Sequence, residues 1–309
     1  MTLRDRAAEL VAHINGTHGL DLELVSAVAA GETRSAHVLR DTAGDEWVLK
    51  WSRASEDSPE NLRQMVAIVD RLREDGYPAP EHLVVGVMGT TAYWIQERLA
   101  GEPIHLVPTR LSEDDHLVRF IPELLRLNDL QAGKGLLGAP PWPDWLLVTL
   151  DRGGDGYCLH ATMASRPETA VMLEQIKSIA DRCRRAPSVS TDIVHFDFSY
   201  ANVLTDGAAI TGVIDWNVPF LGAGQGDRGF DVATLLFYAY DRPRVRQMLW
   251  ESLLERTTEP WAAIFLAHLT LRQVEWCLRF YPETAEEARF LAIGRAVLDD
   301  VLTLLTAPL

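Results

Sequence analysis

The stretch His195-Phe-Asp-Phe-Ser-Tyr-Ala-Asn202 has the pattern H-x-D-x-x-x-x-N, and Val213-Ile-Asp215 adds a second aspartate thirteen residues further on. Apolar runs before and after the first segment predict a loop between short strands. Phosphoryl transfer needs one carboxylate to orient the attacking hydroxyl, and an amide with a second carboxylate to hold Mg²⁺ on the phosphates. Residues of those types stand in that order at Asp197, Asn202 and Asp215. The alternative is that Asp197 and Asp215 are turn residues flanking short strands and that Asn202 is a local cap.

The composition is that of an ordinary globular protein. With 309 residues, 47% hydrophobic and 24% charged, the chain can bury a large core in one domain or in two lobes. No apolar run approaches the length of a membrane span, and the N-terminus lacks a signal core, so we expect a cytoplasmic protein without a membrane partner. The three cysteines are scattered, which argues against a disulfide framework or a zinc cluster.

The charge balance is acidic, with a net charge of −15. This opposes nucleic-acid binding, which depends on Lys and Arg contacts with phosphate. An acidic surface would attract a cationic substrate; it would also serve solubility alone. Only three lysines stand against twenty-six arginines, so Lys50, which lies in a predicted strand, calls for an explanation.

The first hundred residues predict a sheet with helices attached. Residues 4–18 are typical of an amphipathic helix. A second helix begins at Ser58, a good N-cap followed by Pro59, and ends before Gly76. Short apolar runs separated by turn residues predict five strands, the first three of them an antiparallel meander: 22–29, 36–40, 46–51, 82–87 and 91–96.

Beyond residue 103 the pattern is mainly helical. The exception is a strand-rich segment at 192–215. Pro140–Trp145 and the glycine-rich Asp151–Gly156 are typical of surface loops. Helical periodicity predicts six helices, at 113–130, 166–185, 228–240, 243–257, 260–281 and 284–305.

Several motifs resemble those of one known family. Val194–Leu204, Val213–Trp216 and Asp227–Leu236 are its strongest marks, with Val48-Leu-Lys50 similar to its lysine-bearing third strand and Ile95–Pro103 similar to its hinge. The chain thus resembles the aminoglycoside phosphotransferase family, which shares the protein-kinase-like fold with choline kinases. The resemblance runs from about residue 22 to residue 240.

The resemblance implies an α+β, two-lobed protein-kinase-like fold. A small antiparallel β-sheet N-lobe with one helix, which binds nucleotide, would occupy residues 1–96, and residues 97–103 would be the hinge. A larger, mainly helical C-lobe at 104–309 would carry the catalytic loop, the metal site and the acceptor pocket.

The resemblance also implies roles for individual residues. Asp197 would orient the acceptor hydroxyl and accept its proton, and Asn202 and Asp215 would hold Mg²⁺ between the nucleotide phosphates. His195 would be a buried scaffold residue. Asp231 would anchor the catalytic-loop backbone; as an alternative, it is a charge placed at the N-terminus of a helix.

The nucleotide, ATP or GTP, would be bound by the N-lobe. Lys50 would reach the α- and β-phosphates, unless it is a strand-edge lysine with its ammonium in water. The 31–35 turn would cover the phosphates, and Gly31 is its single glycine. Ser35 would donate to a phosphate oxygen or only stabilise the turn. Backbone groups at the start of the hinge would bind the purine, at Glu97, Arg98 and Leu99.

One feature departs from the kinase-like pattern. Such folds pair the strand lysine with a glutamate on the following helix, but Met65 and Val66 stand at that place. Glu60 lies on the face opposite the apolar stripe. The sequence therefore leaves the partner of Lys50 open.

We therefore expect an ATP- or GTP-dependent O-phosphotransferase that modifies a hydroxyl of a small polar natural product, an aminoglycoside-like or nucleoside-type antibiotic, and so confers resistance. A metabolic kinase for choline, homoserine or a sugar is the alternative, and an inactive nucleotide-binding pseudokinase is a third. Residues after 240 would form the acceptor pocket. An acidic and aromatic group there would suit a cationic amine or be only a solvated charged face: Glu275, Trp276, Glu283, Glu286 and Glu287.

Overall fold

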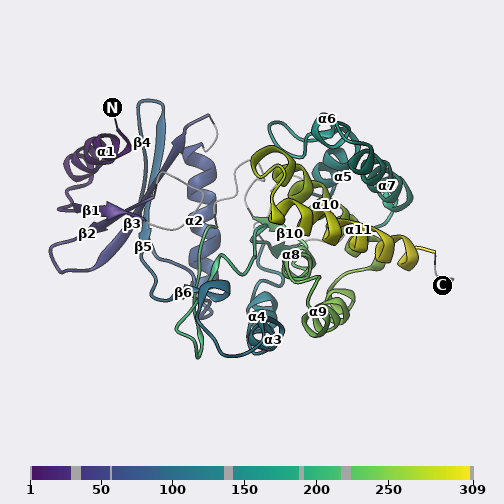
Figure 1. Cartoon of the computed structure of the whole chain (residues 1–309). Helices are drawn as coiled ribbons and strands as arrows, with labels where there is room; N and C mark the ends of the chain where they lie inside the picture. The colour runs from purple at the N-terminus through teal and green to yellow at the C-terminus, as the bar shows by residue number, and fades with distance from the viewer. Residues whose placement is uncertain are drawn as a thin grey trace. The chain divides into compact units, whose positions relative to one another are not determined.

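The computed structural model of the chain describes residues 2–28, 36–55, 58–135, 142–187, 191–216 and 224–306, with the backbone alone described at 142 and 143. The chain divides into two compact units. The first consists of Met1–Leu106 with Asn202–Gly224, and the second of Val107–Ala201 with Gln225–Leu309. Figure 1 shows the elements of both.

A five-stranded sheet forms the basis of the first unit, with the strand order β1-β2-β3-β5-β4. All neighbouring strands pair antiparallel, which confirms the predicted meander and the hairpin that follows it. The strands are β1 (Glu23–Ala27), β2 (His37–Arg40), β3 (Glu46–Arg53), β4 (His82–Met88) and β5 (Thr91–Glu97).

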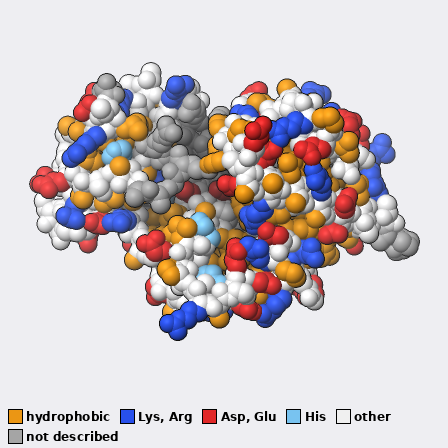
Figure 2. Space-filling model, viewed as in Figure 1, with side chains coloured by type: hydrophobic (Ala, Val, Ile, Leu, Met, Phe, Trp, Pro, Cys, Tyr) orange, Lys and Arg blue, Asp and Glu red, His pale blue; other side chains and the backbone are white. Residues whose placement is uncertain are grey.

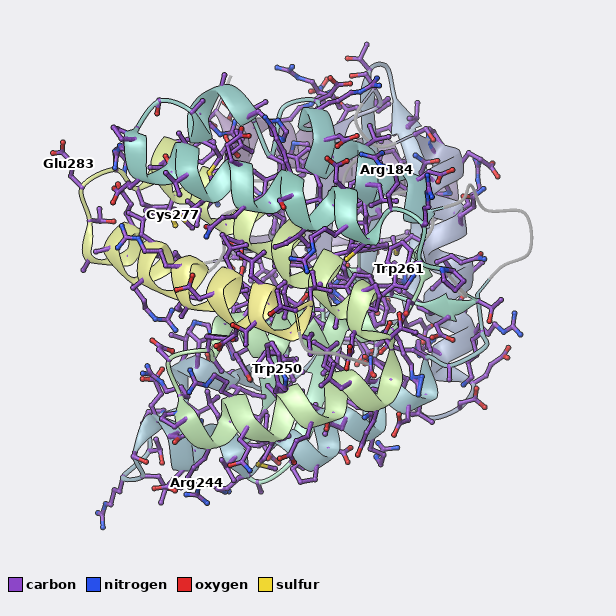
Figure 3. The ribbon with its side chains drawn as sticks, turned by 90° about the vertical axis from the view of Figure 1, so that its right-hand side faces the viewer. Arg184, Arg244, Trp250, Trp261, Cys277 and Glu283 are labelled. Atoms are coloured by element: carbon purple, nitrogen blue, oxygen red, sulfur yellow. The ribbon has the colours of Figure 1, made fainter. Side chains whose placement is uncertain are left out.

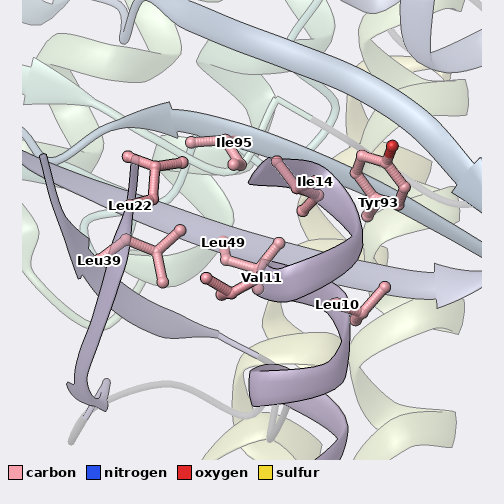
Figure 4. Close-up of a cluster of buried hydrophobic side chains, with 8 residues drawn as sticks. All are labelled: Leu10, Val11, Ile14, Leu22, Leu39, Leu49, Tyr93 and Ile95. Atoms are coloured by element: carbon pink, nitrogen blue, oxygen red, sulfur yellow. The ribbon is translucent and has the colours of Figure 1, made fainter. Parts of the chain in front are cut away.

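Helix α1 (Leu3–His18) covers one face of this sheet. Thr2 and Asp5 form a capping box at its start, and Gly19 ends it in the left-handed conformation with φ 66°. Figure 4 shows the apolar side chains that α1 and the strands bury together: Leu10, Val11, Ile14, Leu22, Leu39, Leu49, Tyr93 and Ile95. Successive strand residues point to opposite faces, so Leu49 in this core leaves Lys50 on the other face of β3.

The second predicted helix is α2 (Pro59–Arg73). The Ser58 side chain accepts a hydrogen bond from the Asn61 N–H, and Pro59 takes the first helical position, where its missing N–H costs nothing. Met65 is buried on this helix. The helix begins and ends as the capping signals predict.

A small three-stranded sheet completes the first unit, with the order β6-β8-β9. It joins β6 (Glu102–Pro103), from the predicted hinge, to the hairpin of β8 (Val203–Thr205) and β9 (Ile210–Val213). Gly101, with φ 114°, makes the close approach possible, because a Cβ there would lie 2.4 Å from Thr211 Oγ1. The segment Asn202–Gly224 therefore groups with the first unit. The predicted lobe boundaries, 1–96, 97–103 and 104–309, remain a prediction.

The second unit is mainly helical (Figure 1). Its short strands β7 (Asp192–Ile193) and β10 (Gln225–Gly226) pair antiparallel. Four of the predicted helices are confirmed nearly to the residue, namely α7 (Pro167–Cys183), α9 (Pro243–Arg256), α10 (Glu259–Phe280) and α11 (Ala285–Leu304). The predicted helix at 228–240 is α8 (Gly229–Tyr238).

Two expectations for this unit were wrong. The predicted helix at 113–130 is two helices, α3 (Glu113–Val118) and α4 (Ile121–Leu130), because Pro122 lacks the N–H that a continuous helix needs. The predicted loop Pro140–Trp145 is helical from residue 142 onwards. It forms α5 (Trp142–Arg152), in which Pro143 falls in the tolerant first turn. A short helix, α6 (His160–Met163), was also missed.

Helix α10 is the central element of the second unit, and its residues are buried along most of its length. Figure 3 shows it among the neighbouring helices, with the labelled Cys277 inside the bundle; this thiol is 2% exposed. Within the described ranges no helix is both long and apolar enough to cross a membrane. Acidic and basic side chains are intermixed on the face seen in Figure 2.

Candidate active site

The β8–β9 hairpin brings two of the predicted residues to one end of the first unit's small sheet. Val203 pairs with Val213, and the Ile214 N–H donates to the Asn202 carbonyl at 2.9 Å. Asn202 lies just before the hairpin and Asp215 just after it, so both are at its open end. Asp215 is in the left-handed conformation, with φ 64°. A non-glycine residue held there carries backbone strain, which is common at functional sites.

Lys50 completes this group. It lies in the middle of β3, opposite Trp94 of β5, and its Nζ forms an ion pair with Asp215 Oδ1. The lysine side chain is 13% exposed and that of Asp215 is 38% exposed. The partner that sequence reasoning left open is therefore this aspartate, 165 positions away. Position 65 of α2 holds a buried methionine instead of a glutamate.

The oxygen donors at this hairpin suit a hard divalent cation. One carboxylate from Asp215 and one amide oxygen from Asn202 leave coordination positions for phosphate and water, as Mg²⁺ prefers. Asn202 is 7% exposed, whereas Asp215 is accessible. Among the described residues no group of three or more His, Cys, Asp or Glu could hold a metal by itself.

Asp197 belongs to the second unit, on the loop that follows β7. The residue before it, Phe196, has a φ of 65° and a fully packed ring. Asp231 of α8 accepts hydrogen bonds from the backbone N–H groups of His195, at 2.8 Å, and of Phe196, at 3.0 Å. A third donor, Gln131 Nε2, lies 2.7 Å from Asp231 Oδ2. A buried carboxylate from one helix thus binds the backbone on the N-terminal side of Asp197.

His195 is enclosed by the protein, with an exposed fraction of 1%. The Asp197 N–H lies 3.3 Å from His195 Nδ1. A backbone N–H can only donate, so this geometry assigns Nδ1 as the acceptor and places the proton of the neutral ring on Nε2. The ring therefore contacts the backbone of Asp197, consistent with a scaffold residue. The roles of His195 and Asp231 remain predictions.

Sequence reasoning missed Arg272. This residue of α10 donates from Nη1 to the Phe196 carbonyl and from Nη2 to Asp197 Oδ1, both at 2.9 Å. Its side chain is 16% exposed. The only signal in the sequence is an arginine within an apolar helix, and a separation of 75 residues hides its partner.

Replacing Asp231 by asparagine should destabilise the second unit. The amide keeps the shape but has one oxygen for two backbone donors, so at least one buried N–H loses its acceptor at a cost of about 1–3 kcal/mol. Urea unfolding of the variant measures this loss. Asp299→Asn, an exposed aspartate of α11, is the matched control, and equal stability of the two variants would contradict the anchoring role.

Asp227, two residues before α8, predicts a pH dependence of stability. Its carboxylate accepts hydrogen bonds from Thr257 Oγ1, at 2.6 Å, and from the Gly229 N–H, at 2.8 Å. Burial nevertheless raises the pKa of Asp227 from 3.8 to about 6. The folded chain therefore keeps this proton to higher pH than the unfolded chain, and the group lowers stability as pH rises from 3.8 to about 6.

We therefore expect the free energy of unfolding of the wild type to fall, relative to Asp227→Asn, by about 2 kcal/mol between roughly pH 4.5 and pH 7. The measurement is urea unfolding of both proteins across this range. Parallel stability curves would show that the carboxyl titrates normally in the folded chain.

Three of the remaining predicted residues, Glu97, Arg98 and Leu99, lie in the hinge segment. The N–H of Glu97 donates to the Glu81 carbonyl at 2.7 Å, and that of Arg98 to the Glu46 carbonyl at 3.1 Å. The Leu99 side chain packs over Gly212 of β9, where a Cβ would lie 2.7 Å from its Cδ1. A purine bond at Glu97 or Arg98 would therefore use a carbonyl. Gly31 and Ser35 lie outside the described residues.

The structure thus brings the predicted residues together in two groups. Lys50, Asn202 and Asp215 belong to the first unit, and Asp197, His195 and Asp231 to the second. Only four residues separate Asp197 from Asn202 in the sequence. The class of protein that this fold and these side chains define is a phosphotransferase.

Comparison with known families supports this class. The model of the phosphotransferase enzyme family matches residues 25–265, more than half of the chain. The chain belongs to this family. The enzyme class predicted from the sequence, a small-molecule kinase with an alcohol group as acceptor, is therefore confirmed. A comparison with curated proteins found no match.

Solved structures show the same fold at low identity. The chain is 13% identical to the amicoumacin kinase hAmiN in complex with AMP-PNP and Ca²⁺, with a TM-score of 0.60 over 97% of this chain and 96% of that one. A putative fructosamine-3-kinase from Haemophilus somnus 129PT is 12% identical, with a TM-score of 0.56 over 94% of this chain and 95% of that one. The spectinomycin phosphotransferase APH(9)-Ia is 12% identical, with a TM-score of 0.55 over 96% of this chain and 98% of that one. The predicted fold class is confirmed.

Proposed function

We propose that the chain transfers the γ-phosphoryl group of ATP or GTP to a hydroxyl of a small polar natural product, an antibiotic, and so inactivates it. The observation that carries the proposal is the contact between Lys50 and Asp215, with Asn202 at the same end of the hairpin. These residues supply the cation, the carboxylate and the amide that bind a nucleoside triphosphate and its metal ion. A cytoplasmic location, expected from the sequence, belongs to this proposal.

The nucleotide-binding residues act through charge. Mg²⁺, when bound, neutralises charge that develops on the transferring phosphoryl group. Asp215 and Asn202 would hold it, and the Lys50 ammonium would leave its ion pair to bind phosphate oxygens. Strand β3 fixes the lysine stem, because Lys50 is paired with β5 across the sheet. The side chain therefore needs to reorient only at its end.

Asp197 would orient the acceptor hydroxyl and take its proton as the bond to phosphorus forms. Its carboxylate is 38% exposed, so an acceptor can reach it. The backbone on its N-terminal side is held by Asp231. A carboxylate on a fixed loop reduces the entropy lost in aligning the hydroxyl. In this proposal Asp197 and the metal-holding residues serve one reaction.

The names of similar structures suggest two classes of acceptor. Two of the similar structures are named as kinases of antibiotics, amicoumacin and spectinomycin. A third is named as a putative fructosamine-3-kinase, which favours a metabolic kinase as the second candidate. Two of the four carboxylates predicted to bind a cationic amine have other partners, since Glu275 pairs with Arg279 and Glu287 with Arg166.

The test is a panel of acceptors. The wild-type protein is incubated with Mg-ATP or Mg-GTP and each compound, and mass spectrometry detects the addition of one phosphate. The antibiotics are aminoglycosides, spectinomycin, amicoumacin and nucleosides; the metabolites are choline, homoserine, sugars and fructosamines. We expect the highest kcat/KM with an antibiotic. Preference for a metabolite would establish the second candidate, and nucleotide binding without transfer would indicate a pseudokinase.

A further inference from the structure

Arg272 of α10 meets the catalytic loop at two points. Nη1 donates to the carbonyl of Phe196 and Nη2 to the carboxylate of Asp197, each at 2.9 Å. One planar guanidinium thus binds the backbone before Asp197 and the side chain of Asp197 itself. A planar fork fixes direction as well as distance, which a lysine ammonium does not.

Phe196 is held from both sides. Its N–H donates to Asp231 of α8, at 3.0 Å, and its carbonyl accepts from Arg272 of α10. Its ring packs edge-on against Phe230, with the ring centroids 5.5 Å apart. Its φ of 65° is unfavourable for a residue with a side chain. Such a conformation persists only when its surroundings impose it, and these two helices supply the polar contacts that do so.

The guanidinium of Arg272 has as side-chain partners the carboxylate of Asp197 and the side chain of Tyr238. α10 is buried along most of its length, and Arg272 is 16% exposed. A guanidinium removed from water needs an anion and acceptors nearby. His268, one turn earlier, is fully buried, and the nearby Glu275 pairs with Arg279. The carboxylate that forms an ion pair with Arg272 is that of Asp197.

We propose that Arg272 is a positioning residue for phosphate transfer: its guanidinium holds the left-handed Phe196 backbone and directs the Asp197 carboxylate toward the acceptor hydroxyl. The inference rests on the function proposed above. It goes further, because it assigns the alignment of Asp197 to one side chain on a distant helix. Arg272 does not touch the nucleotide in this account.

The experiment compares Arg272→Ala, Arg272→Lys and Arg289→Ala with the wild type. Arg289 of α11 is the matched control, because it also binds a carboxylate, that of Asp241 at 2.8 Å, and a carbonyl, that of Tyr238 at 2.8 Å. We expect Arg272→Ala to lower kcat by about 100-fold or more, with the nucleotide KM unchanged. Arg272→Lys should recover only part of this loss, and Arg289→Ala should keep full kcat.

Chemical rescue separates positioning from folding. Methylguanidinium added to Arg272→Ala should restore part of kcat, because it can occupy the vacated space and donate to the same two oxygens. It should restore nothing to Asp197→Ala. If Arg272→Ala does not fold, Arg272→Lys serves in its place, with lower kcat and unchanged nucleotide KM expected. An unchanged kcat in the folded Arg272 variants would overturn the proposal.

A second measurement does not depend on catalysis. Hydrogen exchange of peptides covering residues 191–201 should be faster in Arg272→Ala than in wild type, while peptides of α11 exchange equally. If exchange is faster in Arg272→Ala but the wild-type protein transfers no phosphate, the proposed function is rejected and the loop contact is kept. Equal exchange together with equal kcat would reject the positioning role while leaving the proposed function in place.

Discussion

Replacing Asp197 by alanine should abolish phosphate transfer. A positioned acid or base contributes about 10²- to 10⁴-fold to a rate, and the carboxylate of Asp197 would also align the acceptor hydroxyl. The loss should appear in kcat. Nucleotide binding should persist, because Lys50, Asn202 and Asp215 lie in the other compact unit. Product mass and steady-state kinetics measure the first effect, and calorimetric titration with Mg-ATP measures the second.

Asp299→Ala is the matched control for this variant. It removes an aspartate from the same unit, but from the exposed surface of α11. It should keep wild-type kcat and thermal stability. Full activity of Asp197→Ala on the wild-type acceptor would reject the assigned mechanism, since no other residue in this account orients the hydroxyl.

Asp215→Asn should have the second large effect, through the nucleotide. The substitution keeps the shape but removes the charge that would hold the metal and that pairs with Lys50. Loss of a preorganised electrostatic group at phosphate costs about 10²- to 10³-fold in rate, so we expect activity below about 1% of wild type. The affinity for Mg-ATP should fall as well, which distinguishes this variant from Asp197→Ala.

The control for the second variant is Asp45→Asn, an exposed aspartate that precedes β3 in the same unit. It should bind Mg-ATP as the wild type does. Kinetics over a range of Mg²⁺ concentrations complete the comparison, because a weakened metal site should need more Mg²⁺ for its residual activity. Equal nucleotide affinity in Asp215→Asn and wild type would contradict the metal-holding role.

The fold could be predicted wherever local signals are strong. Ser58 and Pro59 mark the start of α2, and Gly19 and Gly76 have the positive φ that ends a helix or forms a turn. Short apolar runs between turn residues predicted every strand of the five-stranded sheet. Two of the failures came from proline. Pro143 suggested a loop where it occupies the first turn of α5, and Pro122 separates two helices where periodicity predicted one.

The site could be predicted only where its residues share a sequence motif. Asn202 and Asp215 lie on one short hairpin, so their spacing indicated their common location. The partner of Lys50 and the contact of Arg272 with Asp197 depend on tertiary packing across 165 and 75 residues. No local pattern encodes such contacts. Where a kinase-like pattern would place a glutamate on the following helix, α2 has the buried Met65, and Lys50 pairs with Asp215.

Tracing the γ-phosphoryl group distinguishes a small-molecule kinase from a nucleotide-binding protein in one experiment. Wild-type protein is given Mg-ATP labelled in that group, together with the acceptor panel, and the label is traced to small molecule, water or protein. We expect repeated turnover into a phosphorylated small molecule with the wild type, and none with Asp197→Ala. Label that stays in ATP, or that passes only to water or to the protein, would contradict the proposed function.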